Sequence, residues 1–304
     1  MTSTSDLATD RPRWGQARRL AFIDVRLQYD GRINRKDLIA FFDISVPQAS
    51  ADLALYQSMA PANLEYDPRL RTYVALPTFD PQFGRSVATR YLDELSRLAR
   101  GVIAEEDSFI GFVPPTGVVA TPARTIDSAE VATIVRAIRD RHTLQVTYQS
   151  MDAHEPRYWL LTPHAVGFDG LRWHVRAWCH TRQLFRDFAI GRLSIERTVE
   201  SSELIDPESD VGWNTTVAVC LKPHPDLSPL QRQAVMRDYG MKEDRCVLEC
   251  RKAMLFYTLR HLNLQELVVS DNPATQHVVV DNVEEVKRWM SEDRAGVARN
   301  QTPR

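Results

Sequence analysis

Cysteine and lysine are both scarce in this chain of 304 residues, and no long apolar run is present. Four cysteines are few for this length, which fits a reducing compartment rather than a disulfide framework. No segment approaches the roughly 18 consecutive apolar residues that a membrane span needs. The first residues also lack the apolar core of a secretory signal. We therefore expect a cytoplasmic protein that does not enter a membrane.

Sequence motifs of catalysis and metal binding are also missing. The chain contains no GxSxG, no HExxH and no glycine-rich phosphate loop. Cys246 and Cys250 lie close together, but no second Cys or His pair accompanies them at zinc spacing. Cys179 and His180 are neighbours on an expected strand, so they point to opposite faces and cannot form a nucleophile–base pair. We predict no catalytic residues, no metal site and no cofactor.

Charge is balanced overall but uneven along the chain. The net charge of −2 means that an overall basic excess cannot be used to infer nucleic-acid binding. Between Arg11 and Lys36, however, eight basic residues accompany only two acidic ones. Of the 38 basic residues five are lysine and the others are arginine. The planar fork of arginine suits phosphate, although a GC-rich genome gives the same preference.

The first part of the chain has the pattern of a winged helix-turn-helix domain. Hydrophobic periodicity predicts three helices, followed by two short strands around an Asp-Pro-Arg turn. Ser45 is a good N-cap for the third helix, and Pro47 lies in its first turn, where its missing N–H costs little. This order of elements is the outline of a winged helix-turn-helix. The predicted segments are helices 14–29, 35–42 and 45–59 and a hairpin over 63–76, together forming a domain over 13–85.

The remainder of the chain is predicted to contain a linker and two further domains. A helix and a Pro- and Gly-rich arm form the linker over 86–127. A helix with Ser128 as its N-cap then leads into closely spaced strands, which suggest a small closed barrel over 128–206. Strands and helices alternate afterwards, as in an α+β sandwich over 211–292. The predicted helices are 89–100, 128–141, 228–240, 252–262 and 282–290, and the polar ends 1–12 and 293–304 are predicted to be disordered tails.

Residue types in the first domain suit contact with duplex DNA. In a helix-turn-helix, the N-terminal residues of the third helix meet base edges in the major groove. Gln48 is the best candidate for base readout, because an amide can bond an adenine edge bidentately. Nearby arginines and a lysine could hold the phosphate backbone. An ordinary three-helix domain or a protein-contact module remains an alternative on these residues alone. The candidate DNA-binding residues are Arg18, Arg19, Arg35, Lys36, Ser45, Pro47, Gln48, Ala49, Ser50, Arg69 and Arg71.

A second candidate site lies in the stretch GLRWHVRAWCH, residues 170–180. Alternation along a strand would place Leu171, Trp173, Val175, Ala177 and Cys179 on a core face. The opposite face would carry Arg172, His174, Arg176, Trp178 and His180. Forked donors beside aromatic rings suit a nucleotide or single-stranded nucleic acid better than they suit catalysis. The alternative is a charged strand face that pairs with Asp169, Asp187 and Glu196 of the same domain.

The domain order and these residues resemble the WYL-domain transcriptional regulators of bacteria. The most specific similarity lies in RYWLLTPHAVGFDGLRWHVRAWC and FRDFAIGRL, which are similar to the WYL repressors that autoregulate phage-defence islands. The name-giving Trp-Tyr-Leu corresponds to Trp173-His174-Val175 here. The flanking pattern Pro163-His164, Gly170, Arg176 and Phe188…Arg192 carries the match.

The resemblance implies an α+β multidomain fold: an N-terminal winged helix-turn-helix, a central Sm/SH3-like small β-barrel (the WYL domain) and a C-terminal α+β sandwich that contributes to dimer formation. It further implies a homodimeric repressor of a phage-defence operon, which binds double-stranded operator DNA. An anionic ligand, a single-stranded nucleic acid or a nucleotide, would control that binding from the WYL domain. His174 departs from the family motif and adds a titratable donor in place of a phenol. The implied ligand contacts are Tyr148, Ser150, His164, Arg172, His174, Arg176, Arg186 and Arg192.

Two other functions fit parts of the sequence. An accessory protein could bind RNA or single strands through the barrel, without operator specificity, and use the N-terminal domain for protein contacts. Duplex affinity that survives replacement of Gln48 and Arg71 would favour this reading. A nuclease would need metal-dependent cleavage, for which Asp152, Asp169 and Asp187 are a thin set of carboxylates.

Overall fold

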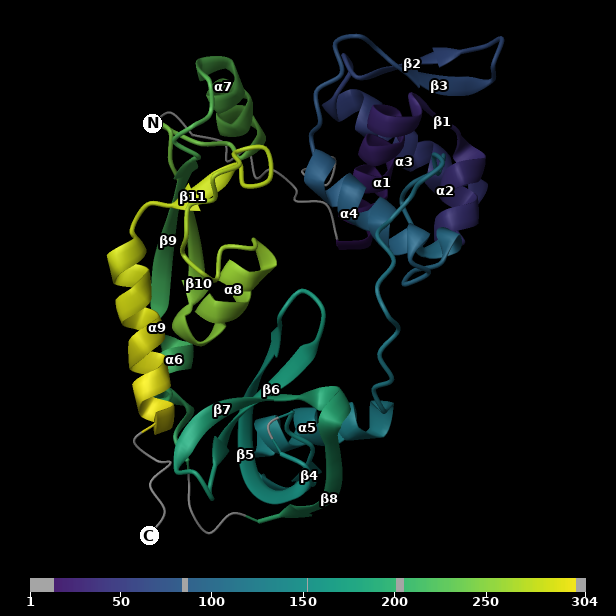
Figure 1. The fold of residues 1–304 in the computed structure, drawn as a ribbon. Helices are drawn as coiled ribbons and strands as arrows, with labels where there is room; N and C mark the ends of the chain where they lie inside the picture. Colours follow the sequence, from purple (N-terminus) through teal and green to yellow (C-terminus); the bar gives the residue numbers. More distant parts are fainter. Residues whose placement is uncertain (1–13, 84–86, 152, 201–204, 299–304) are drawn as a thin grey trace, which may run out of the picture. The chain divides into compact units, whose positions relative to one another are not determined.

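The computed structural model describes residues 14–83, 87–151, 153–200 and 205–298 (Figure 1). The chain divides into two compact units, Met1–Ala120 and Thr121–Arg304. Among the described residues, no single helix is long and apolar enough to cross a membrane. One helix pair in the described part of the chain, Arg35–Phe42 and Val46–Met59, passes that test together by length and composition, and the pair is bent by 119°.

The N-terminal unit contains the three helices and the hairpin that the sequence predicts. A short strand, β1, was not predicted, because two residues carry no readable alternation. It completes a sheet of order β1-β3-β2. Its elements are α1 (Trp14–Asp30), β1 (Arg32–Ile33), α2 (Arg35–Phe42), α3 (Val46–Met59), β2 (Leu64–Asp67), β3 (Thr72–Ala75), α4 (Ala88–Ala99) and a 3-10 turn (Glu105–Asp107).

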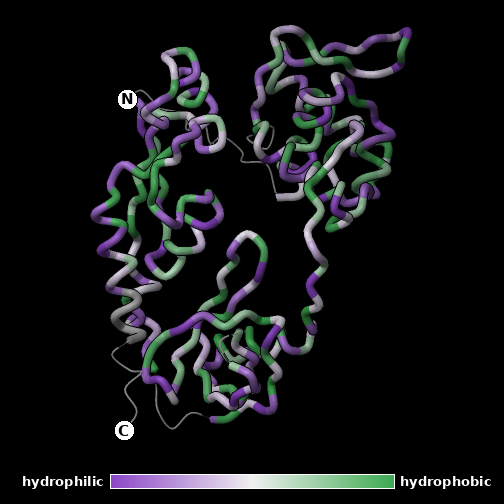
Figure 2. Tube along the Cα trace, in the orientation of Figure 1, coloured by the Kyte–Doolittle hydropathy of each residue, from purple (hydrophilic) through white to green (hydrophobic). Residues whose placement is uncertain are grey.

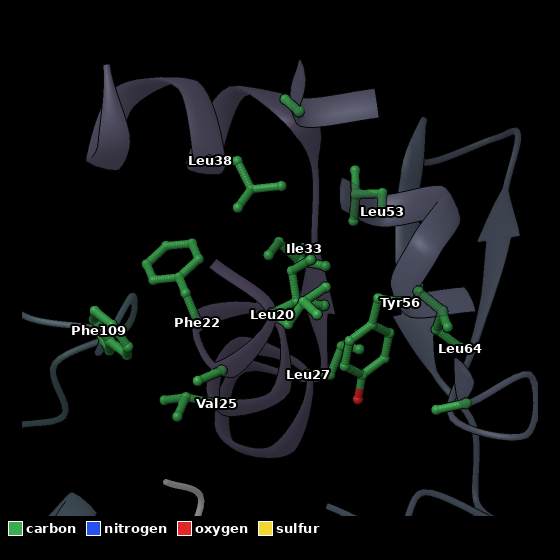
Figure 3. Close-up of a cluster of buried hydrophobic side chains, with 14 residues drawn as sticks. Leu20, Phe22, Val25, Leu27, Ile33, Leu38, Leu53, Tyr56, Leu64 and Phe109 are labelled. Carbon is green, nitrogen blue, oxygen red and sulfur yellow. The ribbon is translucent and has the colours of Figure 1, made fainter. Parts of the chain in front are cut away.

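The core of this unit forms where α1, α2 and α3 meet (Figure 3). Leu20 and Leu27 of α1, Leu38 of α2 and Leu53 of α3 are fully buried or nearly so. Burying such a side chain stabilises the fold by about 1.5–3 kcal/mol. Tyr56 of α3 is also fully buried. The helices that carry the candidate DNA contacts are therefore fixed to one another by apolar packing.

The second unit begins with α5 (Ser128–Asp140) and an open five-stranded sheet of order β7-β6-β5-β4-β8. The predicted closed barrel is not found among the described strands, because β7 and β8 are the two edges of this sheet. A single 3-10 turn (Ile190–Arg192) joins these edge strands. The strands are β4 (Thr143–Tyr148), β5 (Arg157–Phe168), β6 (Trp173–Cys179), β7 (Leu184–Ala189) and β8 (Leu193–Val199).

The C-terminal part of the second unit is a three-stranded antiparallel sheet, of order β10-β9-β11, with helices packed on it. Alternate β9 residues, Val217, Val219 and Leu221, are buried in a core that α7, α8 and α9 share. Along α9, hydrophilic and hydrophobic residues alternate (Figure 2). The elements are α6 (Val211–Asn214), β9 (Thr216–Pro223), α7 (Pro229–Asp238), β10 (Cys246–Arg251), α8 (Leu255–His261), β11 (Val278–Val280) and α9 (Val283–Ala298).

Three details differ from the sequence-based predictions. Asp127 rather than Ser128 caps α5, because its carboxylate accepts from the backbone N–H of Ala129. The helix α9 continues to Ala298, so residues 293–298 are helical rather than a disordered tail. A 3-10 turn (Pro207–Ser209) lies between the two predicted domains, and α6 opens the C-terminal one, where no helix was expected before residue 228. Residues 1–12 and 299–304, the rest of the expected tails, lie outside the described residues.

Candidate nucleic-acid interface and ligand site

The first turn of α3 is open to solvent. The Ser45 hydroxyl caps the helix by accepting a hydrogen bond from the backbone N–H of Gln48 (3.3 Å). Ser45, Val46 and Pro47 are exposed. One turn later, the Ser50 hydroxyl donates to the carbonyl of Val46 (3.0 Å). This end of α3 can approach another surface closely, but it brings no charged side chain.

A buried carboxylate on α3 holds two of the predicted DNA contacts inside the domain. Asp52 has no exposed surface. Arg19 donates to it from Nε (2.6 Å) and Nη2 (3.2 Å), and the Gln48 side-chain amide donates to its Oδ1 (3.1 Å). Ala49 is fully buried in the core and cannot reach a base. Arg19 and Ala49 therefore leave the candidate interface, since both serve the packing of α1 on α3.

Arg18 packs on aromatic rings of its own domain. Its guanidinium carbon lies 5.7 Å from the centre of the Phe109 ring and 6.0 Å from the centres of the Phe42 and Trp14 rings. A guanidinium at this distance is attracted by the negative face of a ring. The structure thus gives Arg18 contacts within its own domain, and its predicted phosphate contact remains a prediction.

The first turn of α2 supplies two exposed basic side chains, Arg35 and Lys36. A capping box fixes this turn: the Asn34 side chain accepts from the backbone N–H of Asp37 (3.3 Å), and the Asp37 carboxylate accepts from the backbone N–H of Asn34 (2.7 Å). The Asn34 side chain also accepts from the backbone N–H of Lys36 (2.7 Å). Arg35 donates from Nη1 to the Ser50 hydroxyl (3.4 Å), so the first turns of α2 and α3 are adjacent. A helix N-terminus favours anions, and phosphate is the group that suits this place.

The turn of the hairpin carries the other two candidate arginines. The Asp67 carboxylate accepts hydrogen bonds from the backbone N–H groups of Arg69 (2.7 Å) and Leu70 (3.0 Å), which sets the turn. Arg71 has a left-handed backbone, with φ of 52°. Both Arg69 and Arg71 are exposed. They extend from a short hairpin of two four-residue strands, as a wing that contacts DNA requires.

The alternation predicted for the stretch 170–180 holds only in its second half. Val175, Ala177 and Cys179 are buried in the core of the sheet, as predicted. Leu171 and Trp173, however, are 53% and 47% exposed. The core does not extend to this end of β6, because β6 begins at Trp173 and the preceding residues form the turn from β5.

The basic residues Arg172, His174 and Arg176 were expected on the other face of this strand. The first two contact Asp169. Arg172 donates from Nε to its Oδ2 (3.2 Å), and His174 Nε2 lies 3.1 Å from the same oxygen. From α8, Arg260 also donates to this oxygen (2.9 Å). Burial alone would raise the pKa of Asp169, but hydrogen bonds from His174 and from the N–H groups of Leu171 and Arg172 outweigh it and hold the pKa far below its ordinary value.

Arg176 makes the corresponding contact with Asp210, which lies just before α6. Its Nε and Nη2 donate to the two carboxylate oxygens of Asp210, at 2.7 and 3.0 Å, and His164 Nε2 lies 2.9 Å from one of them. Both Arg176 and Asp210 are buried. Burial opposes ionisation of Asp210, but His164 and Arg176 outweigh it, so its pKa is far below the ordinary value. The intramolecular pairing that the sequence left open is thus observed for Asp169 and, through Arg176 Nη1 at 3.3 Å, for Asp187.

The ligand contacts that remain accessible gather around a hollow of about 200 Å³ beside β4, β5 and β7. Of the predicted residues, Tyr148, Ser150 and Arg186 line it. Two further arginines, Arg157 and Arg182, also line it and were missed. The strand register places Arg157 opposite Tyr148, so a correct pairing of the two strands would have identified it. The other lining residues are Ala153, Trp159, Asp187 and Phe188.

The hollow combines positive charge with aromatic surface. Within the described residues, neither Arg157 nor Arg186 forms an ion pair. Arg182 lies over the Trp159 ring, 5.8 Å from its centre, and Tyr148 packs edge-on against Phe188. Forked donors with rings beside them can bind a phosphate and a base together. His164 and Arg192 do not line this hollow, and the described residues contain no cluster of His, Cys, Asp and Glu that could hold a metal ion.

Comparison with known proteins divides the chain into three matched regions. Residues 15–97 match the winged helix-turn-helix domain of the BrxR transcriptional regulator. Residues 129–196 match the WYL domain. Residues 216–286 match the C-terminal dimerization domain of the BrxR transcriptional regulator. The candidate DNA contacts lie in the first region, and the hollow lies in the second.

Similarity to whole proteins extends over nearly the full chain. The DNA-binding transcriptional repressor CapW of Stenotrophomonas maltophilia is 65% identical over 289 residues, which cover 95% of this chain and 97% of that protein. The repressor of the same name from Pseudomonas aeruginosa is 42% identical, with 94% and 98% covered. That from Escherichia coli is 41% identical, with 90% and 91% covered.

Proposed function

The chain belongs to the WYL-domain transcriptional regulators of the CapW type, and we propose that it is a homodimeric repressor of a phage-defence operon whose operator binding is controlled by an anionic ligand. The ligand is a single-stranded nucleic acid or a nucleotide, bound in the hollow of the WYL domain. The observation that carries the ligand proposal is the convergence of Arg157, Arg182 and Arg186 on a hollow walled by aromatic rings.

The DNA contacts that we propose are fewer than those predicted from the sequence. Ser45, Pro47 and Ser50 meet base edges, where small side chains allow α3 to lie deep in the major groove. Arg35 and Lys36, at the N-terminus of α2, bind phosphates on one side of α3. The wing residues Arg69 and Arg71 bind a phosphate or the minor groove. Gln48 keeps a role only if its amide leaves Asp52 for a base.

The dimerization region supports a two-fold arrangement on DNA. A homodimer places two copies of α3 on a palindromic operator, with half-sites one or more helical turns apart. The four exposed basic side chains of each protomer would neutralise phosphates, and each such contact adds about 0.9 to the slope of log affinity against log salt. Operator affinity should therefore fall steeply as salt rises.

One titration tests both parts of the proposal. Fluorescence polarisation would measure binding to duplex from the protein's own upstream region and to a scrambled duplex, at two salt concentrations. Each titration would be repeated with a short 5′-phosphorylated oligothymidylate as competitor. We expect tight and selective duplex binding that the oligothymidylate releases. Weak, sequence-blind binding would overturn the repressor assignment and favour an accessory protein that binds RNA or single strands.

Two paired substitutions locate the two sites. Arg69→Ala with Arg71→Ala should weaken operator binding by at least about tenfold while leaving oligothymidylate binding unchanged. Arg157→Ala with Arg186→Ala should leave operator binding unchanged and abolish the response to oligothymidylate. Arg136→Ala, an exposed residue of α5, is the matched control for loss of a surface arginine. If the hollow variant still responds like the wild type, the hollow is not the ligand site.

A further inference from the structure

Asp187 belongs to the hollow and to the polar network beneath it at the same time. Among the described residues, it is the one carboxylate that lines the hollow. Its Oδ1 accepts a hydrogen bond from Arg176 Nη1 (3.3 Å), and its Oδ2 accepts one from the hydroxyl of Tyr257 (3.4 Å). Tyr257 lies on α8, in the region that matches the dimerization domain. A single side chain therefore touches the ligand hollow, β6 and α8.

The contacts of Asp187 are looser than those of its neighbour Asp210. Asp210 holds Arg176 bidentately, at 2.7 and 3.0 Å, and accepts from His164 as well. Because Asp210 continues to neutralise Arg176, Asp187 can turn away without leaving a buried guanidinium unpaired. Asp210 is therefore the fixed partner of Arg176, and Asp187 is the movable one.

An anion in the hollow acts directly on Asp187. The three arginines of the lining attract the anion. The negatively charged carboxylate of Asp187 lines the same hollow, so it repels the anion at short range. Turning Asp187 away relieves this repulsion and breaks its contact with Tyr257. Burial, with the nearby carboxylates of Asp187 and Asp169, raises the pKa of the Tyr257 hydroxyl well above its ordinary value. Tyr257 therefore stays protonated and donates to Asp187 whenever the hollow is empty.

We propose that Asp187 is a positioning residue that couples an anion in the hollow to the dimerization domain through the hydroxyl of Tyr257. This inference rests on the proposed ligand site and adds the route by which its occupation is transmitted. When the hollow is empty, Asp187 stays hydrogen-bonded to Tyr257, and α8 stays in the position that allows the dimer to bind DNA. The occupied hollow releases Tyr257 and, with it, α8. In the structure, the ring of Tyr257 also packs against His174, with centres 5.1 Å apart.

The experiment compares coupling in full-length variants. The coupling factor is the ratio of the operator dissociation constants with and without saturating oligothymidylate, and typical allosteric factors are about 5–150. Tyr257→Phe keeps the ring and loses only the hydroxyl. We expect it to bind oligothymidylate within about twofold of the wild type, while its coupling factor falls to about one-third of the wild-type value or less. Tyr158→Phe, 73% exposed on β5, is the matched control and should couple like the wild type.

Asp187→Asn supplies a second and independent readout. Removing the negative charge should tighten oligothymidylate binding about tenfold while reducing the coupling factor, a combination that a merely structural role would not produce. Glu208→Gln, an exposed acid outside the hollow, is its control. Because both substitutions act on one contact, the double variant should lose no more coupling than the stronger single variant.

The possible failures are distinguishable. A wild-type protein that binds its operator but ignores oligothymidylate overturns the proposed ligand control, and this inference falls with it. A wild type that responds, together with a Tyr257→Phe variant that responds equally, overturns the inference alone. If Tyr257→Phe fails to fold, Asp187→Asn decides: unchanged oligothymidylate affinity and unchanged coupling overturn the proposal.

Discussion

Asp210→Ala removes the buried carboxylate on which three elements of the second unit converge. The side chain of Asp210 accepts hydrogen bonds from Arg176, from His164 and from the backbone N–H of Trp213, where it caps α6. It is 1% exposed, so water cannot replace these contacts without a rearrangement. We expect this substitution to be among the most destabilising in the unit.

The magnitude follows from the separate contacts. Breaking a buried ion pair by removing one partner costs about 3–5 kcal/mol. Arg176 keeps its contact with Asp187 at 3.3 Å, so the lower end, about 3 kcal/mol, applies. Loss of the α6 cap adds about 1 kcal/mol. For a unit of this size, a loss of about 4 kcal/mol corresponds to a fall in Tm of about 8–16 °C.

Tryptophan fluorescence during urea unfolding reports mainly on the second unit, because five of the six tryptophans lie within residues 121–304. The variant should shift the midpoint to lower urea without a change in slope. Glu208→Ala, a nearby exposed acid, should change the free energy of unfolding by no more than about 0.5 kcal/mol. A loss of less than about 1 kcal/mol for Asp210→Ala would refute the argument, since Arg176 would then need no partner in Asp210.

Two further predictions also concern buried carboxylates. Because folding depresses the pKa of Asp169 and Asp210, their stabilisation is complete above the unfolded pKa of about 3.9, declines below it, and is gone once the pH falls through the folded values. Urea midpoints of the second unit should therefore drop between about pH 5 and about pH 3, and Asp210→Asn should flatten this drop; an equal drop in the variant would assign it to other groups. In the first unit, Tyr56 donates a hydrogen bond to the fully buried Asp24, so Tyr56→Phe should lower stability by about 1–3 kcal/mol in urea unfolding followed by circular dichroism. Tyr66→Phe, about half exposed, is the control, and equal effects of the two substitutions would contradict the assignment.

Local pattern was sufficient to place most elements of the fold. The N-cap at Ser45 and the buried alternation of Val175, Ala177 and Cys179 were both read from neighbouring residues, and the structure confirms them. Where a core ends is not a local property, which is why Leu171 and Trp173 were expected to be buried. Closure of the sheet likewise depends on pairing between strands and could not be read from their spacing.

The candidate site was harder to predict, because its arginines find partners far away in the sequence. Arg19 pairs with Asp52 and Arg176 with Asp210, at separations of 33 and 34 residues. Strand alternation indicated which side Arg176 faces, and local charge suggested that Arg19 could bind phosphate, but neither showed that a carboxylate lies beside each arginine. Asp210 was missed because its segment had no regular pattern. Arg157 and Arg182 were missed because they line the hollow only once β4 has paired with β5 and β7 with β6.

The composition of α3 has a consequence for how a ligand would release DNA. Asp52 is the one charged residue of α3, and it is buried, so the base contacts of this helix are short-range contacts of small side chains. Such contacts lose about a quarter to a half of their attraction when a shift opens a gap of about 0.5–1 Å, because dispersion attraction falls off steeply with distance. The phosphate contacts of Arg35, Lys36 and the wing are long-range and tolerate that shift. A ligand that moves one protomer against the other should therefore abolish the preference for operator over scrambled duplex before it abolishes binding, with the salt dependence largely retained. Loss of all duplex binding at once, with no intermediate loss of preference, would instead indicate that the anion competes with DNA for the basic surface itself.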